Sequence, residues 1–266
     1  MFYIENEINM VDNAFSMDNL SVRWGQSLGL ALSQFCSGQV PDNYDELISK
    51  GSNMLELATV RNLSTSAPYK FVLITAPSAV GKGTIGRILE SNGILRIPRT
   101  ITRARRPNEA ETDYHFVNQD EYDRIFTAGE FLCPTDFSTS ATSCAGIEKK
   151  IFFSAIESGR PFYIDSGSGT AMQIKQEPML SNIRFAIAFI LPPTFEEMVS
   201  RMIKRINQET TKIESGVVGK SMNESIMRKR LLIATEHLAQ SVFYADLFVV
   251  NDEPNRATAQ ILRLFS

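Results

Sequence analysis

The chain has 266 residues, of which 43% are hydrophobic, and its net charge of −3 argues against a protein that binds nucleic acid through a basic surface. No run of about 18 apolar residues occurs and no basic start precedes an apolar block, so we expect neither a membrane span nor a secretion signal. The cysteines Cys36, Cys133 and Cys144 lack metal-ligand spacing, which favours free thiols and a cytoplasmic location.

Residues 1–66 are predicted to form a helical extension that precedes the main domain. After Asp18, apolar side chains recur at helical spacing, and they are Leu20, Trp24, Leu28, Leu32 and Phe35. A second helix is expected after Pro41, and residues 62–68 are typical of a polar linker. Because an apolar stripe needs a partner that buries it, these helices either pack on the main domain or join copies of the chain into a homo-oligomer.

Residues 70–90 (KFVLITAPSAVGKGTIGRILE) predict a strand, a loop of small residues around one lysine, and the start of a helix. Backbone N–H groups at a helix start lack intrahelical partners, so this arrangement binds polyphosphate. The residues expected to contact ATP are Ala79, Val80, Gly81, Lys82, Gly83 and Thr84. Ala76 replaces the first glycine of the usual motif. Gly83 replaces the residue whose hydroxyl contacts Mg²⁺, so the metal ligands stay unassigned.

A strand is predicted from Ile94 to Ile97, and an arginine-rich segment follows it. Arg99, Arg103, Arg105 and Arg106 fall within eight residues of an otherwise acidic protein, and the sequence DYHFV (113–117) comes shortly after. The planar guanidinium group donates two parallel hydrogen bonds to phosphate oxygens. After a phosphate-binding loop, this cluster favours a second phosphate site over an ordinary solvated basic surface.

From Phe71 to the C-terminus, the sequence resembles the guanylate kinase family. Order and approximate spacing agree over about three quarters of the chain. The matching segments are APSAVGKGT (76–84), TRARRP with DYHFV (102–117), GEFL (129–132), YID (163–165), ILPPTFEEM (190–198), RKRL (228–231) and VVND (249–252). The resemblance implies an α/β fold, with a parallel five-stranded sheet flanked by helices around a phosphate loop (P-loop), a small acceptor-binding region, a lid and the N-terminal helical extension. It places the catalytic domain at 67–266, the acceptor-binding region at about 98–150 and the lid at about 205–222.

The resemblance also assigns the acceptor site residue by residue. The family clamps the acceptor phosphate with two arginines and a tyrosine, which correspond to Arg103, Arg106 and Tyr114. Arg99 stands where the family has a serine, and it adds a positive charge.

The base-reading side of the site is altered. Asp136 replaces a glutamate that reads guanine, Asp165 corresponds to a second acidic reader, and the family's Tyr-Gly-hydroxyl run is absent. Since a site discriminates strongly only when its hydrogen-bonding partners are in place, we expect weakened selectivity for guanine.

On the donor side, the resemblance implies ATP-contacting and catalytic arginines. Arg201 and Arg205 lie on a helix that begins near Thr194, and Arg230 lies on the helix that returns from the lid. Arg201 is expected to bind ATP, whereas Lys82, Arg205 and Arg230 are expected to stabilise charge on the transferred phosphoryl group.

The predicted function is therefore ATP-dependent phosphoryl transfer, with Mg²⁺, to a small phosphorylated acceptor, most simply GMP or a related nucleoside monophosphate. One alternative acceptor is a phosphorylated sugar such as ribose bisphosphate. A second alternative is a non-catalytic guanylate-kinase-like binding domain, although Gly81, Lys82, Arg205 and Arg230 are all retained.

Overall fold

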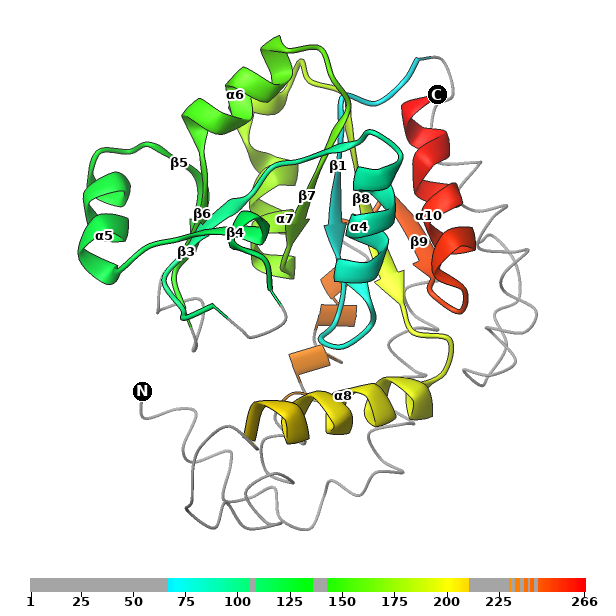
Figure 1. Ribbon diagram of the computed structural model, residues 1–266. Helices are drawn as coiled ribbons and strands as arrows, with labels where there is room; N and C mark the ends of the chain where they lie inside the picture. Colours follow the sequence, from blue (N-terminus) through cyan, green and yellow to red (C-terminus); the bar gives the residue numbers. More distant parts are fainter. Residues whose placement is uncertain are drawn as a thin grey trace. The chain divides into compact units, whose positions relative to one another are not determined.

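The computed structural model describes residues 67–105, 109–135, 143–210 and 244–266, and positions 230, 233–234, 237–238 and 240–241 between the last two ranges (Figure 1). The predicted N-terminal helices, Arg106, Asp136 and residues 211–222 of the predicted lid lie outside the described residues. The chain divides into two compact units. The first includes Pro77–Val80 and Pro192–Val242, and the second includes Gly81–Leu191, Phe243–Ser266 and the segment that ends at Ala76.

The second unit contains the predicted parallel sheet of five strands, in the order β2-β7-β1-β8-β9. Its strands are β1 (Phe71–Thr75), β2 (Leu95–Arg96), β7 (Phe162–Ser166), β8 (Phe185–Leu191) and β9 (Leu247–Val250). Every residue of β1 is fully buried, as expected for a central strand that is covered on both faces. The α/β class predicted from the sequence is confirmed.

Helices cover both faces of this sheet. In Figure 1, α4 (Lys82–Ser91) and α10 (Pro254–Leu262) lie together on one face, and α7 (Ser168–Gln176) lies on the other. Right-handed crossovers from β1 to β2 and from β7 to β8 run in opposite directions along the sheet, which places their helices on opposite faces. Parallel pairing of β1 with β7 sets Thr75 beside Ser166, so the carboxyl ends of these two strands meet at one edge.

A second sheet, with the strand order β4-β3-β6-β5, lies within the region 98–150 that the sequence assigns to the acceptor. Its elements are β3 (Arg99–Ile101), η1 (Glu111–Asp113), β4 (Tyr114–Phe116), α5 (Gln119–Thr127), β5 (Phe131–Thr135) and β6 (Ala145–Glu148). A small core of Tyr122, Ile125, Phe131 and Cys144 supports it. The buried Tyr122 hydroxyl lies 2.8 and 2.9 Å from the carbonyl oxygens of Thr135 and Ala145.

The sequence predicts a helix over residues 147–158, and the helix observed there begins later. Gly146 and Ile147 belong to β6, because they pair with Thr100 of β3 and Leu132 of β5. The helix α6 then spans Lys149–Glu157. The remaining short helices of this unit are η2 (Pro178–Leu180) and η3 (Arg263–Phe265).

In the first unit, α8 spans Phe195–Thr210, so residues 206–210 of the predicted lid are helical. The Glu197 N–H donates to Thr194 Oγ1 at 3.0 Å, which confirms Thr194 as the cap of this helix.

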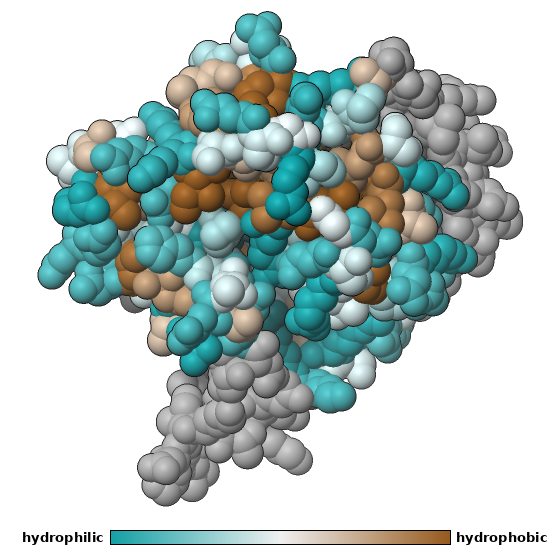
Figure 2. All heavy atoms as spheres, turned by 45° about the horizontal axis from the view of Figure 1, so that its top comes forward, coloured by the Kyte–Doolittle hydropathy of each residue, from teal (hydrophilic) through white to brown (hydrophobic). Residues whose placement is uncertain are grey.

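Figure 2 shows hydrophilic side chains over most of one face, with hydrophobic side chains gathered in a band across it. None of the helices in the described part of the chain has the length and apolar character that a membrane span requires.

Candidate active site

The phosphate loop has the backbone geometry of an anion-binding turn. Ala79 and Gly81 have positive φ angles of 68° and 103°, and α4 begins at Lys82 without a side-chain cap at Gly81. The first N–H groups of α4 are therefore available to an anion at the positive end of the helix dipole. Ala76 is absent from the described residues with positive φ, so alanine is accommodated where the motif has its first glycine. Nothing in the sequence predicts the left-handed backbone conformation of Ala79.

The Lys82 ammonium group is held at the carboxyl end of β7. Its Nζ lies 2.9 Å from Asp165 Oδ1 and donates to the Ser166 carbonyl oxygen at 2.8 Å. Burial alone would raise the pKa of Asp165. The charge and hydrogen bond of Lys82, with the charges of Arg99 and Arg96, hold that pKa below its usual value. Asp165 is thus an ionised partner of the loop lysine, whereas its predicted role in reading the base stays a prediction.

Two of the predicted clamp residues, Arg103 and Tyr114, lie in contact. The Arg103 guanidinium lies over the Tyr114 ring, 5.1 Å from its centroid, and 5.8 Å from that of Phe116. It also donates two hydrogen bonds to the Glu109 carboxylate, at 2.6 and 2.7 Å, and both side chains are mostly buried, at 14% and 16% exposed. Glu109 thus presents to Arg103 the two oxygens that a phosphate would present. Its charge and its spacing from Arg103 are visible in the sequence, but the pairing itself is not.

Arg99 contributes a further cation to the same unit. It lies on β3 in register with Tyr114 on β4, and its charge helps to hold the pKa of Asp165 below its usual value. Burial, the largest effect, raises the pKa of Tyr114, and the nearby Asp165 carboxylate adds to this rise. Within the described residues, the buried Nε of Arg99 has no hydrogen-bond partner. An acceptor anion would supply one.

In the first unit, α8 brings its arginines to the loop segment Pro77–Val80. Arg201 donates to the Val80 carbonyl oxygen at 3.3 Å, and Arg205 donates to Ser78 Oγ at 3.4 Å. The two arginines are four residues apart and so share one face of the helix. Ser78 was not singled out in the sequence. Arg230 lies in a helical stretch of the same unit, and its catalytic role stays a prediction.

Comparisons with known proteins bear on this arrangement. A family model described as guanylate kinase matches residues 69–265. The guanylate kinase of Trichormus variabilis is 30% identical over 212 residues, which cover 75% of this chain and 93% of that protein. The guanylate kinase of Symbiobacterium thermophilum is 28% identical over 194 residues, which cover 71% and 81%.

A solved structure shows the same fold. The crystal structure of guanylate kinase from Anaplasma phagocytophilum aligns with a TM-score of 0.53 and 19% identity, covering 75% of this chain and 85% of that one. The sequence match extends over the loop, the clamp residues and the α8 arginines. The chain therefore belongs to the guanylate kinase family.

Proposed function

We propose that this protein is an ATP-dependent phosphotransferase that moves the γ-phosphoryl group of ATP to GMP or a closely related nucleoside monophosphate. The observation that carries the proposal is the set of groups around one carboxylate, that of Asp165. The loop lysine Lys82 lies 2.9 Å from it, and the predicted acceptor residues Arg99 and Tyr114 interact with it electrostatically. Residues predicted for the donor side and for the acceptor side, although distant in the sequence, thus act on one carboxylate within one unit.

The residues suit phosphoryl transfer by positioning and charge neutralisation. Lys82 would neutralise charge on the β- and γ-phosphates, and Arg205 and Arg230 would stabilise the transferred group. Arg201 would hold the loop through the Val80 carbonyl while ATP is bound. On the acceptor side, the Arg103 fork, Tyr114 and Arg99 would orient the accepting phosphate for in-line attack, together with Arg106 and Asp136 by resemblance.

The acceptor phosphate would have to compete with Glu109 for Arg103. Both groups offer paired oxygens to one guanidinium, so they exclude each other at that fork. A phosphate dianion carries more charge than a carboxylate, which favours the exchange when the acceptor enters.

The residues of this site fit an Mg²⁺ ion that is held mainly by the phosphates of the nucleotide. No group of three or more acidic, histidine or cysteine side chains that could hold a metal occurs among the described residues. Mg²⁺ is usually held by nucleotide phosphates and waters with one or two protein ligands, and the Thr84 hydroxyl is a candidate in this loop. The bound ion would supply charge neutralisation at the phosphates.

The relatives favour GMP as the acceptor over a phosphorylated sugar, because they are named guanylate kinases. They also favour catalysis over a binding role.

The buried free thiols Cys133 and Cys144 support a cytoplasmic location. We further propose that residues 1–66 mediate self-association, and removing them should leave the catalytic domain folded while changing its oligomeric state by sedimentation.

The donor assignment is tested by Lys82→Met, which removes the charge but keeps most of the aliphatic stem. We expect loss of ADP formation with GMP, with thermal unfolding unchanged apart from the loss of one ion pair. Lys150→Met, at an exposed position on α6, is the matched control and should retain full activity. Turnover by Lys82→Met at the rate of the control would exclude the assigned role of the loop.

The acceptor assignment is tested by kcat/KM for GMP against AMP, CMP, UMP and ribose phosphates. We expect GMP to be used, with a smaller margin over the other nucleotides than a site with intact base readers would give. Absence of turnover with every nucleoside monophosphate would overturn the proposal.

A further inference from the structure

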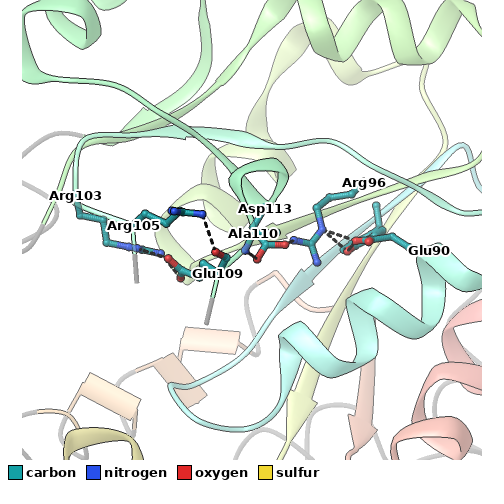
Figure 3. A network of polar contacts seen from close by, with 8 residues as sticks. Glu90, Arg96, Arg103, Arg105, Glu109, Ala110 and Asp113 are labelled. Atoms are coloured by element: carbon teal, nitrogen blue, oxygen red, sulfur yellow. Dashed lines mark hydrogen bonds and ion pairs between the residues drawn. The ribbon is translucent and has the colours of Figure 1, made fainter. Parts of the chain in front are cut away.

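We propose that Arg96 is a positioning residue for the acceptor site, and this inference rests on the proposed function. Arg96 lies on the short edge strand β2, and its side chain is only 12% exposed. Its guanidinium contacts side chains from three other elements. It pairs with Glu90 of α4 at 2.5 Å, donates to the Tyr163 hydroxyl of β7 at 2.6 Å, and pairs with Asp113 of η1 (Figure 3).

The contacts continue from Asp113 to the acceptor residues. One Asp113 oxygen pairs with Arg96, and the other accepts from the Ala110 N–H at 2.9 Å. This single carboxylate therefore closes the turn from Ala110 to Asp113, and Tyr114 follows it directly. Glu109 precedes Ala110 and holds Arg103. Figure 3 shows these groups as one continuous row from α4 to Arg103.

The remaining contacts of Arg96 make its position well determined. The Tyr163 hydroxyl accepts from Arg96 and donates to Glu90 at 2.5 Å, so the three side chains form a closed set of hydrogen bonds. Burial raises the pKa of Tyr163, which keeps this donor protonated. The guanidinium carbon also lies over the Tyr163 ring, 5.5 Å from its centroid.

The helix that follows the phosphate loop is shaped around this set. A Cβ atom on Gly86 would lie 2.5 Å from the Tyr163 hydroxyl and 3.0 Å from an Arg96 nitrogen. Only a residue without a side chain fits there without displacing Tyr163 or Arg96. Glu90 lies near the C-terminal end of α4, far along the helix from Lys82, and Arg96 is the smallest of the charge effects on Asp165. Losing Arg96 should therefore affect the acceptor turn more than the phosphate loop.

The test is Arg96→Met, which removes the charged fork but keeps an apolar stem. We expect the KM for GMP to rise about tenfold while the KM for ATP stays within about twofold, because only the turn that carries acceptor residues loses its anchor. Asp113→Asn breaks the same link from the other side and leaves Arg96 with Glu90 and Tyr163. It should also raise the KM for GMP. In the double variant, the rise in this KM should be much smaller than the product of the two single rises, because both substitutions break the same link.

Arg124→Met is the matched control, because Arg124 pairs with Glu121 on the exposed face of α5 in the same unit. A KM change shared equally by GMP and ATP, or multiplicative effects of the two variants, would overturn the positioning role. If Arg96→Met does not fold, the proposal is tested with Asp113→Asn alone, by comparing its effect on the KM for GMP with its effect on the KM for ATP.

Amide hydrogen exchange over residues 109–116 gives a readout independent of turnover. We expect faster exchange there in both variants and unchanged exchange in Arg124→Met. An absence of wild-type turnover would count against the proposed function. Unchanged exchange over 109–116 would count against the role of Arg96.

Discussion

The two sheets of the second unit differ in their balance of apolar and polar contacts. In the five-stranded sheet, Phe71 stacks on Phe162 and Phe185 with centroid distances of 5.1 and 4.9 Å, and every residue of the central strand β1 is fully buried. The four-stranded sheet combines its small apolar core with ion pairs and polar contacts. The Arg103–Glu109 pair and the Thr100 hydroxyl, which donates to Glu148 at 2.5 Å, are examples.

This difference suits the two parts to different tasks. A polar substrate cannot replace the apolar contacts that bury the five-stranded sheet. We therefore expect this sheet to hold Lys82 and Asp165 in the same positions with and without substrate. A partly buried ion pair can be exchanged for another anion at small net cost, because one charged hydrogen-bonding partner replaces another. We therefore expect the proposed acceptor site to exchange Glu109 for a phosphate without losing its fold.

The largest expected effect is in the parallel sheet. Phe162→Ala should lower the free energy of unfolding by about 3–5 kcal/mol, because it removes a fully buried ring between Phe71 and Phe152. Urea denaturation measures this loss. Phe126→Ala, on the exposed side of α5, should cost far less. Equal losses would mean that the aromatic cluster does not dominate stability.

Overpacking should reveal the small core of the acceptor sheet. A Cβ atom on Gly146 would lie 2.6 and 2.7 Å from Phe131 ring atoms, so Gly146→Ala should cost about 1–3 kcal/mol. Gly169→Ala, on α7 with no atom within 4 Å of the new Cβ, should be neutral or slightly stabilising in thermal unfolding. A neutral Gly146→Ala would show that Phe131 moves freely and that this sheet is loosely packed.

Substitutions of the two members of the Arg103–Glu109 pair should change the affinity for the acceptor in opposite directions. Glu109→Gln removes the competing negative charge and should lower the KM for GMP by roughly fivefold, equivalent to about 1 kcal/mol. Arg103→Met should raise that KM and lower kcat, because binding and orientation of the phosphate are both lost. Steady-state kinetics at saturating ATP measures both. Glu121→Gln is the control, and a higher KM in Glu109→Gln would mean that Glu109 supports the clamp.

The smallest effect is the pH dependence from Cys133 on β5. Burial, with the negative charge of Glu177, raises the pKa of this thiol from 9.0 to about 12. Below pH 9 the thiol is protonated in both states, so it adds no pH dependence. Above pH 9 the unfolded chain releases the proton while the folded chain keeps it, and stability falls.

Urea denaturation at several pH values isolates this contribution. The stability of the wild-type protein should decline relative to that of Cys133→Ala between pH 9 and 11. A constant difference across that range would contradict the raised pKa.

Local patterns predicted much of the fold. The apolar run before the loop predicted β1, and the lysine-centred loop predicted the start of α4, because such signals depend on neighbours within one element. The 147–158 prediction was wrong at its start, since Ile147 and Glu148 pair across strands with Leu132 and Phe131 of β5 and so belong to β6. Local periodicity contains no information on such partners.

Contiguous residues were enough to predict the phosphate loop and the arginine-rich segment, whereas the resemblance to the guanylate kinase family predicted the α/β class. The tertiary structure alone decided which charges face each other. Lys82 meets the Ser166 carbonyl oxygen across 84 positions because β7 pairs with β1 in parallel, and Arg96 meets Asp113 because η1 folds back toward β2. Those pairings depend on strand order and register, which are set by burying both faces of the sheet and cannot be read from the order of the residues.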